Sequence, residues 1–457
     1  MRKVSALLFS ITIIPFVVQA QTGRDYGWYT EGDYTPAARV KVVVQNELDF
    51  DRTDCPVVIP RSEFPLPDIS DFFVTVVDPA LPPDPEPSEE EIRAVGGWKT
   101  RRETNGHYLR YQLDDLDKDG LWDELYFACD IGAGETKTLY VYVQPPQKRW
   151  LRGLYPHDTH CVVGNYERNF ISWWESALHG WKIAALTDVD MYGKRQEIFI
   201  SPFECIKNWA GYNRPYEYGM DILLVGDTFG AAGVCLFEES AFPDSVSRPR
   251  FSPTAAAGQF NNTRYSRDVV VNGPMRSIIL LRIMNWRSGS GLYEIEQYFT
   301  AYANKSWSTC RTVFTEFVPG NADTMFGVGM RAIMNENDVF REGGTVISFG
   351  RDVPIESPHP DETGAEKLRT VIDFEAIALV VRDEYRPEYR YIESYGGNHA
   401  FCIPVTADRT YEYLFAGAWS EGMLNTTAGE FKDYVRKAAE EFNHPLKIAA
   451  MQVEHKK

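Results

Sequence analysis

The stretch Val269–Trp286, which reads VVVNGPMRSIILLRIMNW, decides the fold class. It is followed by LYEIEQYFTAY at Leu292–Tyr302 and by TCRTVFTEF at Thr309–Phe317. Each run is short, rich in β-branched and aromatic residues, and bounded by turn-forming residues, which is the pattern of β-strands. Comparable runs continue toward the C-terminus, at 325–330, 345–349, 371–381, 399–405 and 411–416. Many strands at short spacing predict an all-β fold, a large β-sandwich.

One long helix is predicted within this strand-rich half, at about 428–442. Thr427 and Glu430 form a capping box at its start, and Pro445 ends it. Phe431 and Val435 lie on its apolar face, together with Tyr434, Ala438 and Phe442. A final strand is predicted at 446–453. We assign residues 160–457 to a central and C-terminal large β-sandwich.

Upstream of this half, residues 37–145 are predicted to form an N-terminal β-module. It follows a loose polar leader at 21–36. The segment LPPDPEPSEEE at 81–91 reads as a solvated insertion, because its prolines forbid regular structure, with one helical turn capped by Ser88 and Glu91. The module's strands are predicted at 40–44, 72–77, 107–113, 124–131 and 138–143.

The first twenty residues have the pattern of a cleaved export signal. Arg2 and Lys3 precede an apolar stretch at 7–18, and Val18-Gln19-Ala20 fits a cleavage site. The apolar stretch is too short to span a membrane. We therefore expect a periplasmic or secreted protein with no membrane span.

The chain of 457 residues carries a net charge of −18 at pH 7, which does not favour nucleic acid or anionic membranes as partners. Its seven cysteines are far apart and include no CxxC pair, so a zinc ribbon is not expected. Cys129, Cys235 and Cys402 lie in apolar runs and are expected in the core, although one or two disulfides remain open.

Residues 173–237 mix aromatic rings, charges and glycines more densely than any other part of the chain. Rings can meet the apolar face of a sugar while charged groups bond its hydroxyls and carboxylates. The alternative is an aromatic core with a polar rim, as in any large β-protein. The candidate substrate-binding residues are Trp173, Trp174, Arg195, Tyr218 and His399.

Two reactions on a sugar fit the charged residues of this region. Glycoside hydrolysis needs two carboxylates that face the scissile bond, and Glu175 with Asp221 is a candidate pair. Elimination next to a uronate needs a cation on the carboxylate and a group that moves the C5 proton. Tyr192 or His179 could move this proton, and Lys194, Arg195 or Arg276 could hold the carboxylate. Arg276 could equally close the turn after Gly273-Pro274, and Lys194 and Arg195 could be a solvated face.

An acidic turn in the N-terminal module is a candidate calcium site. Its carboxylates alternate in a tight loop around Gly120, and hard oxygen ligands at this spacing suit Ca²⁺. The alternative is a solvated acidic hairpin turn. No nucleophile or base accompanies the turn, so a bound ion would be structural, and no cofactor is required. The candidate ligands are Asp115, Asp117, Asp119, Asp123 and Glu124.

Several motifs together resemble a secreted bacterial family known as domain of unknown function four-eight-six-one. They are Asn46-Glu47-Leu48, DDLDKDGLWDELYF with GAGETKTLYVYV, WESALHGW, DMYGKR, YGMDILLVG with GAAGVCLF, and NGPMR. The family is found with polysaccharide-degrading enzymes. The resemblance implies a β-sandwich similar to that of galactose mutarotases, and action on uronate-ended oligosaccharides as a dehydratase or lyase.

The chain departs from the family pattern before Gly219-Met220-Asp221. Relatives often carry a His and a Trp there, whereas this chain reads YNRPYEY at 212–218. If that His is the base of the family, this protein would have to use a Tyr or be inactive. We therefore expect a carbohydrate-active enzyme of polysaccharide degradation, a carbon–oxygen lyase acting on acidic oligosaccharides. A glycoside hydrolase and a non-catalytic glycan-binding protein are the alternatives.

Overall fold

The computed structural model describes most of the chain. The described residues are 27–28, 36–66, 73–82, 88–94, 108–144, 156–166, 169–183, 187–205, 215–238, 246–249, 263–356 and 369–456. The predicted export signal, the leader up to residue 26 and the YNRPYEY segment up to Arg214 lie outside this set. No described helix is long and apolar enough to cross a membrane.

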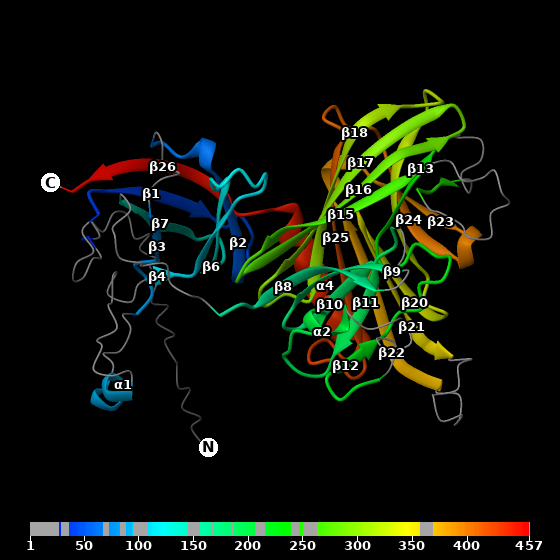
Figure 1. Cartoon of the computed structure of the whole chain (residues 1–457), viewed down its shortest axis with the longest axis horizontal. Coiled ribbons are helices and arrows are strands. Elements are labelled where there is room, and N and C mark those ends of the chain that lie inside the picture. The colour runs from blue at the N-terminus through cyan, green and yellow to red at the C-terminus, as the bar shows by residue number, and fades with distance from the viewer. Residues whose placement is uncertain are drawn as a thin grey trace, which may run out of the picture.

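The described strands form five sheets in two bodies (Figure 1). The smaller body contains the terminal sheet and the small sheet, which enclose one apolar core between them. The terminal sheet has the order β26 (Lys447–His455), β1 (Ala38–Gln45), β7 (Thr136–Gln144), β3 (Phe73–Val77) and β4 (Tyr108–Leu109). The small sheet has the order β2 (Arg52–Pro60), β6 (Glu124–Ile131) and β5 (Tyr111–Asp114).

The last strand of the chain belongs to this smaller body. Strand β26 pairs antiparallel with β1 along its full length, from Ala38 opposite His455 to Gln45 opposite Lys447. Figure 1 shows this red strand beside the blue β1, far from the rest of the C-terminal half. Because β26 completes the N-terminal sheet, the range 160–457 that the sequence suggested for the large sandwich includes a strand that lies elsewhere.

The larger body is a sandwich of three sheets. The large sheet has the order β15 (Arg264–Asn272), β16 (Arg276–Ser288), β17 (Gly291–Tyr302), β18 (Trp307–Val318), β25 (Thr410–Trp419), β22 (Arg369–Val381), β21 (Thr345–Glu356) and β20 (Asn335–Glu342). The central sheet has the order β12 (Gly219–Asp221), β11 (Asp190–Lys194), β10 (His179–Ile183), β9 (Asn169–Ser176) and β8 (Thr159–Tyr166). The flanking sheet has the order β14 (Val246–Ser247), β13 (Gly233–Phe237), β19 (Met325–Arg331), β24 (Asn398–Ile403) and β23 (Glu388–Ile392).

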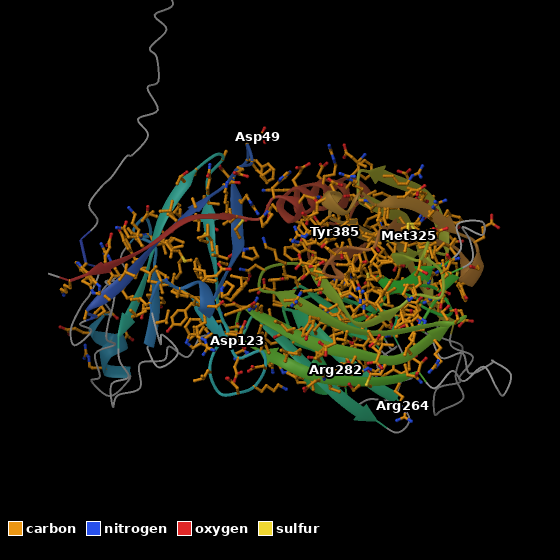
Figure 2. The ribbon with its side chains drawn as sticks, turned by 90° about the horizontal axis from the view of Figure 1, so that it is seen from above. Asp49, Asp123, Arg264, Arg282, Met325 and Tyr385 are labelled. Carbon is orange, nitrogen blue, oxygen red and sulfur yellow. The ribbon has the colours of Figure 1, made fainter. Side chains whose placement is uncertain are left out.

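The main core fills the space between the large sheet and the other two sheets. Trp181 of the central sheet, Val328 of the flanking sheet and Phe299 of the large sheet belong to one cluster of buried apolar side chains. Figure 2 shows side chains filling this interior, with Met325 and Tyr385 in the larger body. The expected all-β sandwich is therefore confirmed.

The described helices are few and short, apart from one. Helix α4 (Ala428–Asn443) begins at Thr427, whose hydroxyl accepts a hydrogen bond from the backbone N–H of Glu430, as the capping box predicts. Its buried residues Phe431 and Val435 pack on the outer face of the large sheet. The other helices are α1 (Glu89–Ala94), α2 (Ser201–Glu204) and the 3-10 turns η1 (Arg61–Glu63), η3 (Asp383–Tyr385) and η4 (Ser394–Gly396).

All seven cysteines are buried and free, so the disulfides that the sequence left open are not formed.

Candidate functional site

The two faces of the central sheet have opposite chemistry. Successive side chains of a strand point to opposite faces, and Trp174, Trp181 and Met191 point into the main core. The outer face therefore carries Trp173, Lys182, Asp190, Tyr192 and Asp221. The pairing aligns them, since Trp173 lies opposite Lys182, Lys182 opposite Asp190, and Tyr192 opposite Asp221. All five are buried, at 8% exposure or less.

Lys182 stands between two carboxylates. Its Nζ lies 3.0 Å from Asp190 Oδ2 and 2.5 Å from Asp221 Oδ2, and 5.4 Å from the centre of the Trp173 ring. Burial and the neighbouring Asp221 raise the pKa of Asp190 to about 7 despite the ammonium group. Burial also raises the pKa of Asp221. The pair can therefore exchange a proton near neutral pH, which a general acid or base requires.

Tyr192 lies opposite Asp221 in the pairing of β11 with β12. Among the described residues the hydroxyl has no hydrogen-bond partner, and neither has Asp221 Oδ1. Burial and the nearby Glu204 carboxylate raise the pKa of Tyr192, so the phenol keeps its proton and can donate it. Glu204 itself accepts a hydrogen bond of 2.6 Å from the Tyr218 hydroxyl. The arrangement places a tyrosine that keeps its proton on the same face of the sheet as the carboxylate pair.

A glycine makes room for the Tyr192 ring. Gly219 begins β12 and lies opposite Lys194. A Cβ atom on Gly219 would stand 2.9 Å from Tyr192 Cε1 and 2.2 Å from the carbonyl oxygen of Gly193, closer than packed atoms tolerate. The glycine is therefore needed at this position for β11 and β12 to pair with the tyrosine between them.

A second group of buried charges continues from Asp221 into the large sheet. Arg331 Nη1 lies 3.3 Å from Asp352 Oδ2, and the fully buried Glu375 is next to them. Burial and the adjacent Asp352 raise the pKa of Glu375 well above its usual value, and Asp221 adds to this. Glu375 therefore holds its proton more strongly than an exposed glutamate does. Buried carboxylates clustered in this way are typical of functional sites.

The sequence reasoning missed Lys182, Glu204 and Glu375 as site residues. Lys182 had a usable signal, because a lysine in the otherwise apolar strand HGWKI must either pair with an acid or face solvent. Asp190 and Tyr192 are two residues apart in one strand and so share a face. Glu375 had no local signal, since its neighbours are Asp352 and Asp221 from distant strands.

Lys194 and Glu175 form a separate buried pair on the same face, and all their polar atoms are engaged. Lys194 donates to Glu175, to the Ser176 carbonyl at 2.6 Å and to the Ile198 carbonyl at 2.7 Å. Glu175 accepts in addition from the backbone N–H groups of Ile200 and Ser201. Burial lowers the pKa of Lys194. This pair fixes the chain that follows β11, so neither residue is free to bind a sugar.

Arg276 does not share a surface with Tyr192, contrary to the expectation of one common cleft. It begins β16 and reaches the smaller body, where Nε binds Asp114 Oδ2 at 2.5 Å and Nη2 binds Glu124 Oε2 at 2.5 Å. Trp174 is also separate, since it points into the core and donates to Ser308 Oγ at 2.8 Å. Trp173 and Trp174 are both fully buried, so neither offers a ring face to solvent in this structure.

The remaining candidates lie at different places. His179 is buried beside Trp181, and burial lowers its pKa to about 3, so it stays neutral. His399 lies in β24 of the flanking sheet, with Nε2 2.7 Å from Glu336 Oε1 and Nδ1 2.9 Å from the Tyr389 hydroxyl. These contacts hold His399 in a local network away from the central sheet.

Tyr218 packs against the apolar cluster of the outer face, whereas Arg195 lies on the opposite face of β11, beside Trp419. Arg195 pairs with Glu421 at 2.6 Å and lies 4.8 Å from the Trp419 ring centre. Its side chain is 24% exposed. The Tyr218 ring stacks on Tyr216, with 5.0 Å between the ring centres. Of these two candidates, only Tyr218 therefore shares a face of the sheet with Tyr192.

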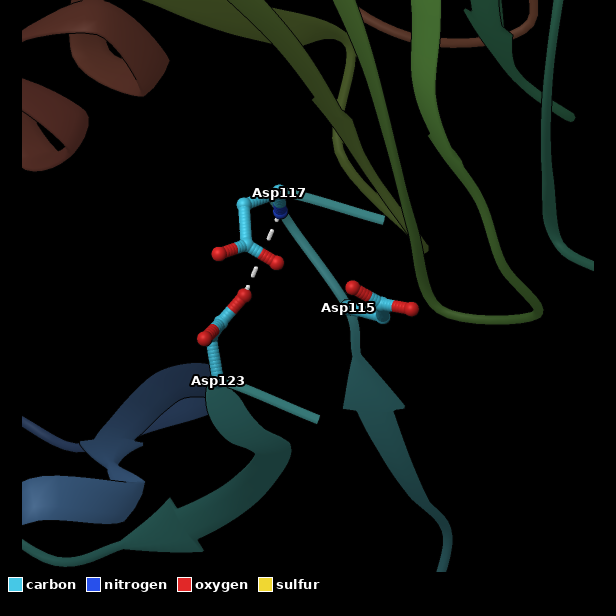
Figure 3. Close-up of side chains that lie close together, drawn as sticks. All are labelled: Asp115, Asp117 and Asp123. Atoms are coloured by element: carbon cyan, nitrogen blue, oxygen red, sulfur yellow. Dashed lines mark hydrogen bonds between the residues drawn. The ribbon is translucent and has the colours of Figure 1, made fainter. Parts of the chain in front are cut away.

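The acidic turn brings three of its five predicted ligands together. One oxygen from each of Asp115, Asp117 and Asp123 lies within 4.8 Å of the others (Figure 3). Asp119 instead accepts a hydrogen bond of 2.8 Å from the Leu121 N–H, and Glu124 binds Arg276. Asp123 already accepts from the N–H groups of Leu116 and Asp117, which orders the turn. The set of predicted Ca²⁺ ligands is thus reduced from five carboxylates to three.

A family match covers most of this chain. The family described as "Domain of unknown function (DUF4861)" matches residues 100–151 and 167–448. The chain belongs to this family. The match spans both bodies, including the acidic turn, the outer face of the central sheet and helix α4. A comparison with curated proteins finds no match.

Solved structures similar to this DUF4861 protein have very different sequences. A protein in glycosyl hydrolase family 38 from Enterococcus faecalis has 9% identity and a TM-score of 0.36, over 93% of this chain and 48% of that one. An alpha-mannosidase from Enterococcus faecalis V583 gives the same identity and TM-score, over 93% and 47%. A putative kojibiose phosphorylase from the human microbiome has 6% identity and a TM-score of 0.30, over 64% and 37%. The chain thus spans less than half the length of each.

Proposed function

We propose that this protein is a carbohydrate-active lyase or dehydratase, which acts on the uronate end of an oligosaccharide at the outer face of the central sheet. The observation that carries the proposal is the buried group of Lys182, Asp190 and Asp221, with Tyr192 opposite Asp221 on the same face. Elimination needs a base for the proton next to a carboxylate and an acid for the departing oxygen, and this group offers both.

The two proton-transfer roles follow from the environments of the side chains. The Asp190 and Asp221 pair, with the pKa of Asp190 at about 7, removes the C5 proton. The C4–C5 double bond forms as the C4–O bond breaks, and Tyr192, which keeps its proton, donates to the departing oxygen. Lys182 balances the negative charge that grows on the substrate carboxylate. Tyr218, at the border of the outer face, is the group that meets the saccharide first.

Paired-carboxylate hydrolysis fits the structure less well. Glu175, its proposed first carboxylate, is bound by Lys194 and by two backbone N–H groups. A carboxylate with its oxygens engaged in this way cannot approach a scissile bond without losing those hydrogen bonds. A glycan-binding protein without catalysis would not need a proton-exchanging pair beside a phenol.

The test is to incubate the protein with uronate-ended oligosaccharides and to follow absorbance at about 235 nm, where the unsaturated product of an elimination absorbs. We expect the absorbance to rise with wild-type protein, and the rate to fall by about 10²–10⁴-fold in Tyr192→Phe and in Asp221→Asn. Tyr389→Phe is the matched control, because it removes a tyrosine hydroxyl from the flanking sheet.

Each alternative gives a different result in this assay. New reducing ends without absorbance would establish hydrolysis, and saturable binding without either signal would establish a glycan-binding protein. A rate in Tyr192→Phe equal to that of the Tyr389→Phe control would remove Tyr192 from the reaction.

We also propose that Asp115, Asp117 and Asp123 hold a structural Ca²⁺, which supplies no chemistry at the central sheet. Three carboxylates within 4.8 Å of one another support the proposal. Added Ca²⁺ should raise the melting temperature of the wild type and not that of Asp117→Asn, because the two carboxylates that remain in the variant bind the ion only weakly. A melting temperature that Ca²⁺ leaves unchanged would rule the site out.

A further inference from the structure

A cavity of about 520 Å³ separates the two bodies, on the side of the molecule away from the central sheet. Its floor is the outer face of the large sheet, where β16, β17, β18 and β25 lie side by side. Strand β2 and the acidic turn form one wall, and the C-terminal end of α4 forms the other. In Figure 2 the loop that carries Asp123 lies at this junction, near the strands of the large sheet. The volume is in the range of small-molecule sites.

The floor combines aromatic rings with hydroxyl groups. Tyr298, Tyr302 and Trp307 line the cavity, and Thr300 and Thr309 lie between them on neighbouring strands, opposite each other in register. The Tyr302 hydroxyl lies 3.0 Å from Thr309 Oγ1. Rings beside hydroxyls on one flat surface fit a ligand whose ring has an apolar face and a polar edge.

The charged residues of the cavity are balanced in sign. Arg276 binds Glu124, and Arg382 binds Glu412 at 2.6 Å, so each of these guanidinium groups is neutralised locally. Asp117 lines the wall formed by the acidic turn, and Glu441 lines the wall formed by α4. A small anion would need an excess of positive charge, which this cavity does not have. A ligand with many hydroxyls, in contrast, can use both donors and acceptors.

Two arginines keep hydrogen-bonding capacity for such a ligand. Arg311 lies exposed on β18 opposite Tyr298, its guanidinium carbon is 5.6 Å from that ring, and it makes no ion pair with a described residue. Arg52 is 3% exposed, and its Nη1 donates to the His444 carbonyl at 2.9 Å. Its buried Nε has no partner among the residues that the structure describes. Donors placed beside an aromatic wall give a sugar its orientation.

We propose that this inter-body cavity is a second saccharide site, which binds a neutral sugar segment of one or two rings. The site is independent of the elimination chemistry proposed above, because it lies on the opposite face of the sandwich and contains none of the residues assigned to proton transfer. A sugar segment bound here would keep the protein attached to the polysaccharide on which it acts.

The experiment is isothermal titration calorimetry of the full chain with a panel of neutral disaccharides, namely cellobiose, lactose, maltose and mannobiose. We expect saturable binding of at least one disaccharide at one site per chain. The dissociation constant should rise at least tenfold in Arg311→Gln and in Tyr298→Ala. Because Arg311 is exposed, Arg311→Gln keeps the fold and remains informative if Tyr298→Ala does not fold.

Two control variants locate the binding. Arg351→Gln removes an exposed arginine from β21 of the same sheet, where it pairs with Asp373, and should leave the dissociation constant unchanged. Tyr192→Phe should also leave it unchanged, while it stops elimination. The inference is wrong if no disaccharide of the panel binds, if Arg311→Gln binds as tightly as Arg351→Gln, or if acetate binds as well as the sugars. A protein with no lyase activity but with this binding would refute only the proposed reaction.

Discussion

The residue that holds the candidate site together is Lys182. It is fully buried, and its ammonium group is the cation that lies between Asp190 and Asp221. A charge in such a place is stable only while its partners remain, because burial has removed the water that would otherwise solvate it. The same desolvation raises the pKa of both aspartates. The burial that makes the fold depend on Lys182 is therefore also the cause of the raised pKa values.

Replacing Lys182 by Met should destabilise the fold by about 3–5 kcal/mol, because two buried carboxylates lose their shared cation. Urea denaturation measures the free energy of unfolding. Lys118→Met is the matched control, since Lys118 pairs with Asp268 at the surface, and should cost about 1 kcal/mol or less. A Lys182→Met protein as stable as the control would show that the aspartates do not need the cation.

Asp190 should make stability depend on pH in an unusual direction. Its pKa rises from 3.8 to about 7 in the folded chain, which therefore keeps a proton that the unfolded chain has released. The corresponding contribution to stability is present below about pH 4 and is lost as the pH rises to about 7. The stability of the wild type relative to Asp190→Asn should thus decrease over this range.

Urea denaturation of both proteins at about pH 4.5 and about pH 7.5 checks this expectation. Comparison with Asp190→Asn cancels the titrating groups that do not contact Asp190, including His179, whose lowered pKa works in the opposite direction. A difference between the two proteins that stays constant with pH would contradict the raised pKa of Asp190.

At the scale of elements, strand β26 protects the smaller body. It covers one edge of β1, whose buried Val40, Val42 and Val44 belong to the core of that body. An uncovered strand edge offers unpaired N–H and C=O groups to other chains.

The acidic insertion behaves as its composition predicts, because α1 (Glu89–Ala94) begins one residue after Ser88. Local signals are sufficient for such short, exposed elements.

Removal of residues 447–455 should lower the melting temperature of the smaller body and cause association of the protein in solution. The reason is that β1 becomes an exposed edge. Light scattering during thermal unfolding measures both effects. Gln452→Ala, which removes an exposed side chain from β26 and keeps its backbone, should behave like the wild type. A truncated chain that remains monomeric would show that β1 is protected by other means.

At the scale of the whole molecule, Arg276 joins the two bodies. Its guanidinium group binds Asp114 and Glu124 of the small sheet, and Gln112 accepts hydrogen bonds from the backbone N–H groups of Met275 and Arg276. The contact is buried, so its polar groups depend on one another for solvation. The same junction closes the cavity that we propose as a saccharide site.

Replacing Arg276 by Met should separate the unfolding of the two bodies. Asp114 would stay buried without its cation, and this should weaken the contact between the two bodies by about 3–5 kcal/mol. Scanning calorimetry should then resolve two transitions where the wild type has one. Arg282→Met is the control, since Arg282 lies on the same strand with a half-exposed partner, Glu296. A single transition in Arg276→Met would show that other contacts couple the bodies.

The sequence by itself determined the strands, the late helix and the family. Period-two alternation fixes which residues share a face of a strand, and the Thr427 cap fixes where α4 begins, because both depend only on local geometry. It also singled out Tyr192 and Asp221, which the structure brings opposite each other in the central sheet. It could not tell which face of β11 points outward, since both faces carry large side chains and both are buried.

Only the tertiary structure decided which distant residues meet. Arg276 binds carboxylates that precede it by more than 150 positions, and β26 pairs with the first described strand. Lys182 finds Asp221 across two intervening strand pairings. Strand partners and ion pairs of this kind depend on how much free energy is gained when whole strand faces are buried together. This free energy is a sum over the molecule, so no short stretch of sequence reveals which partners will meet.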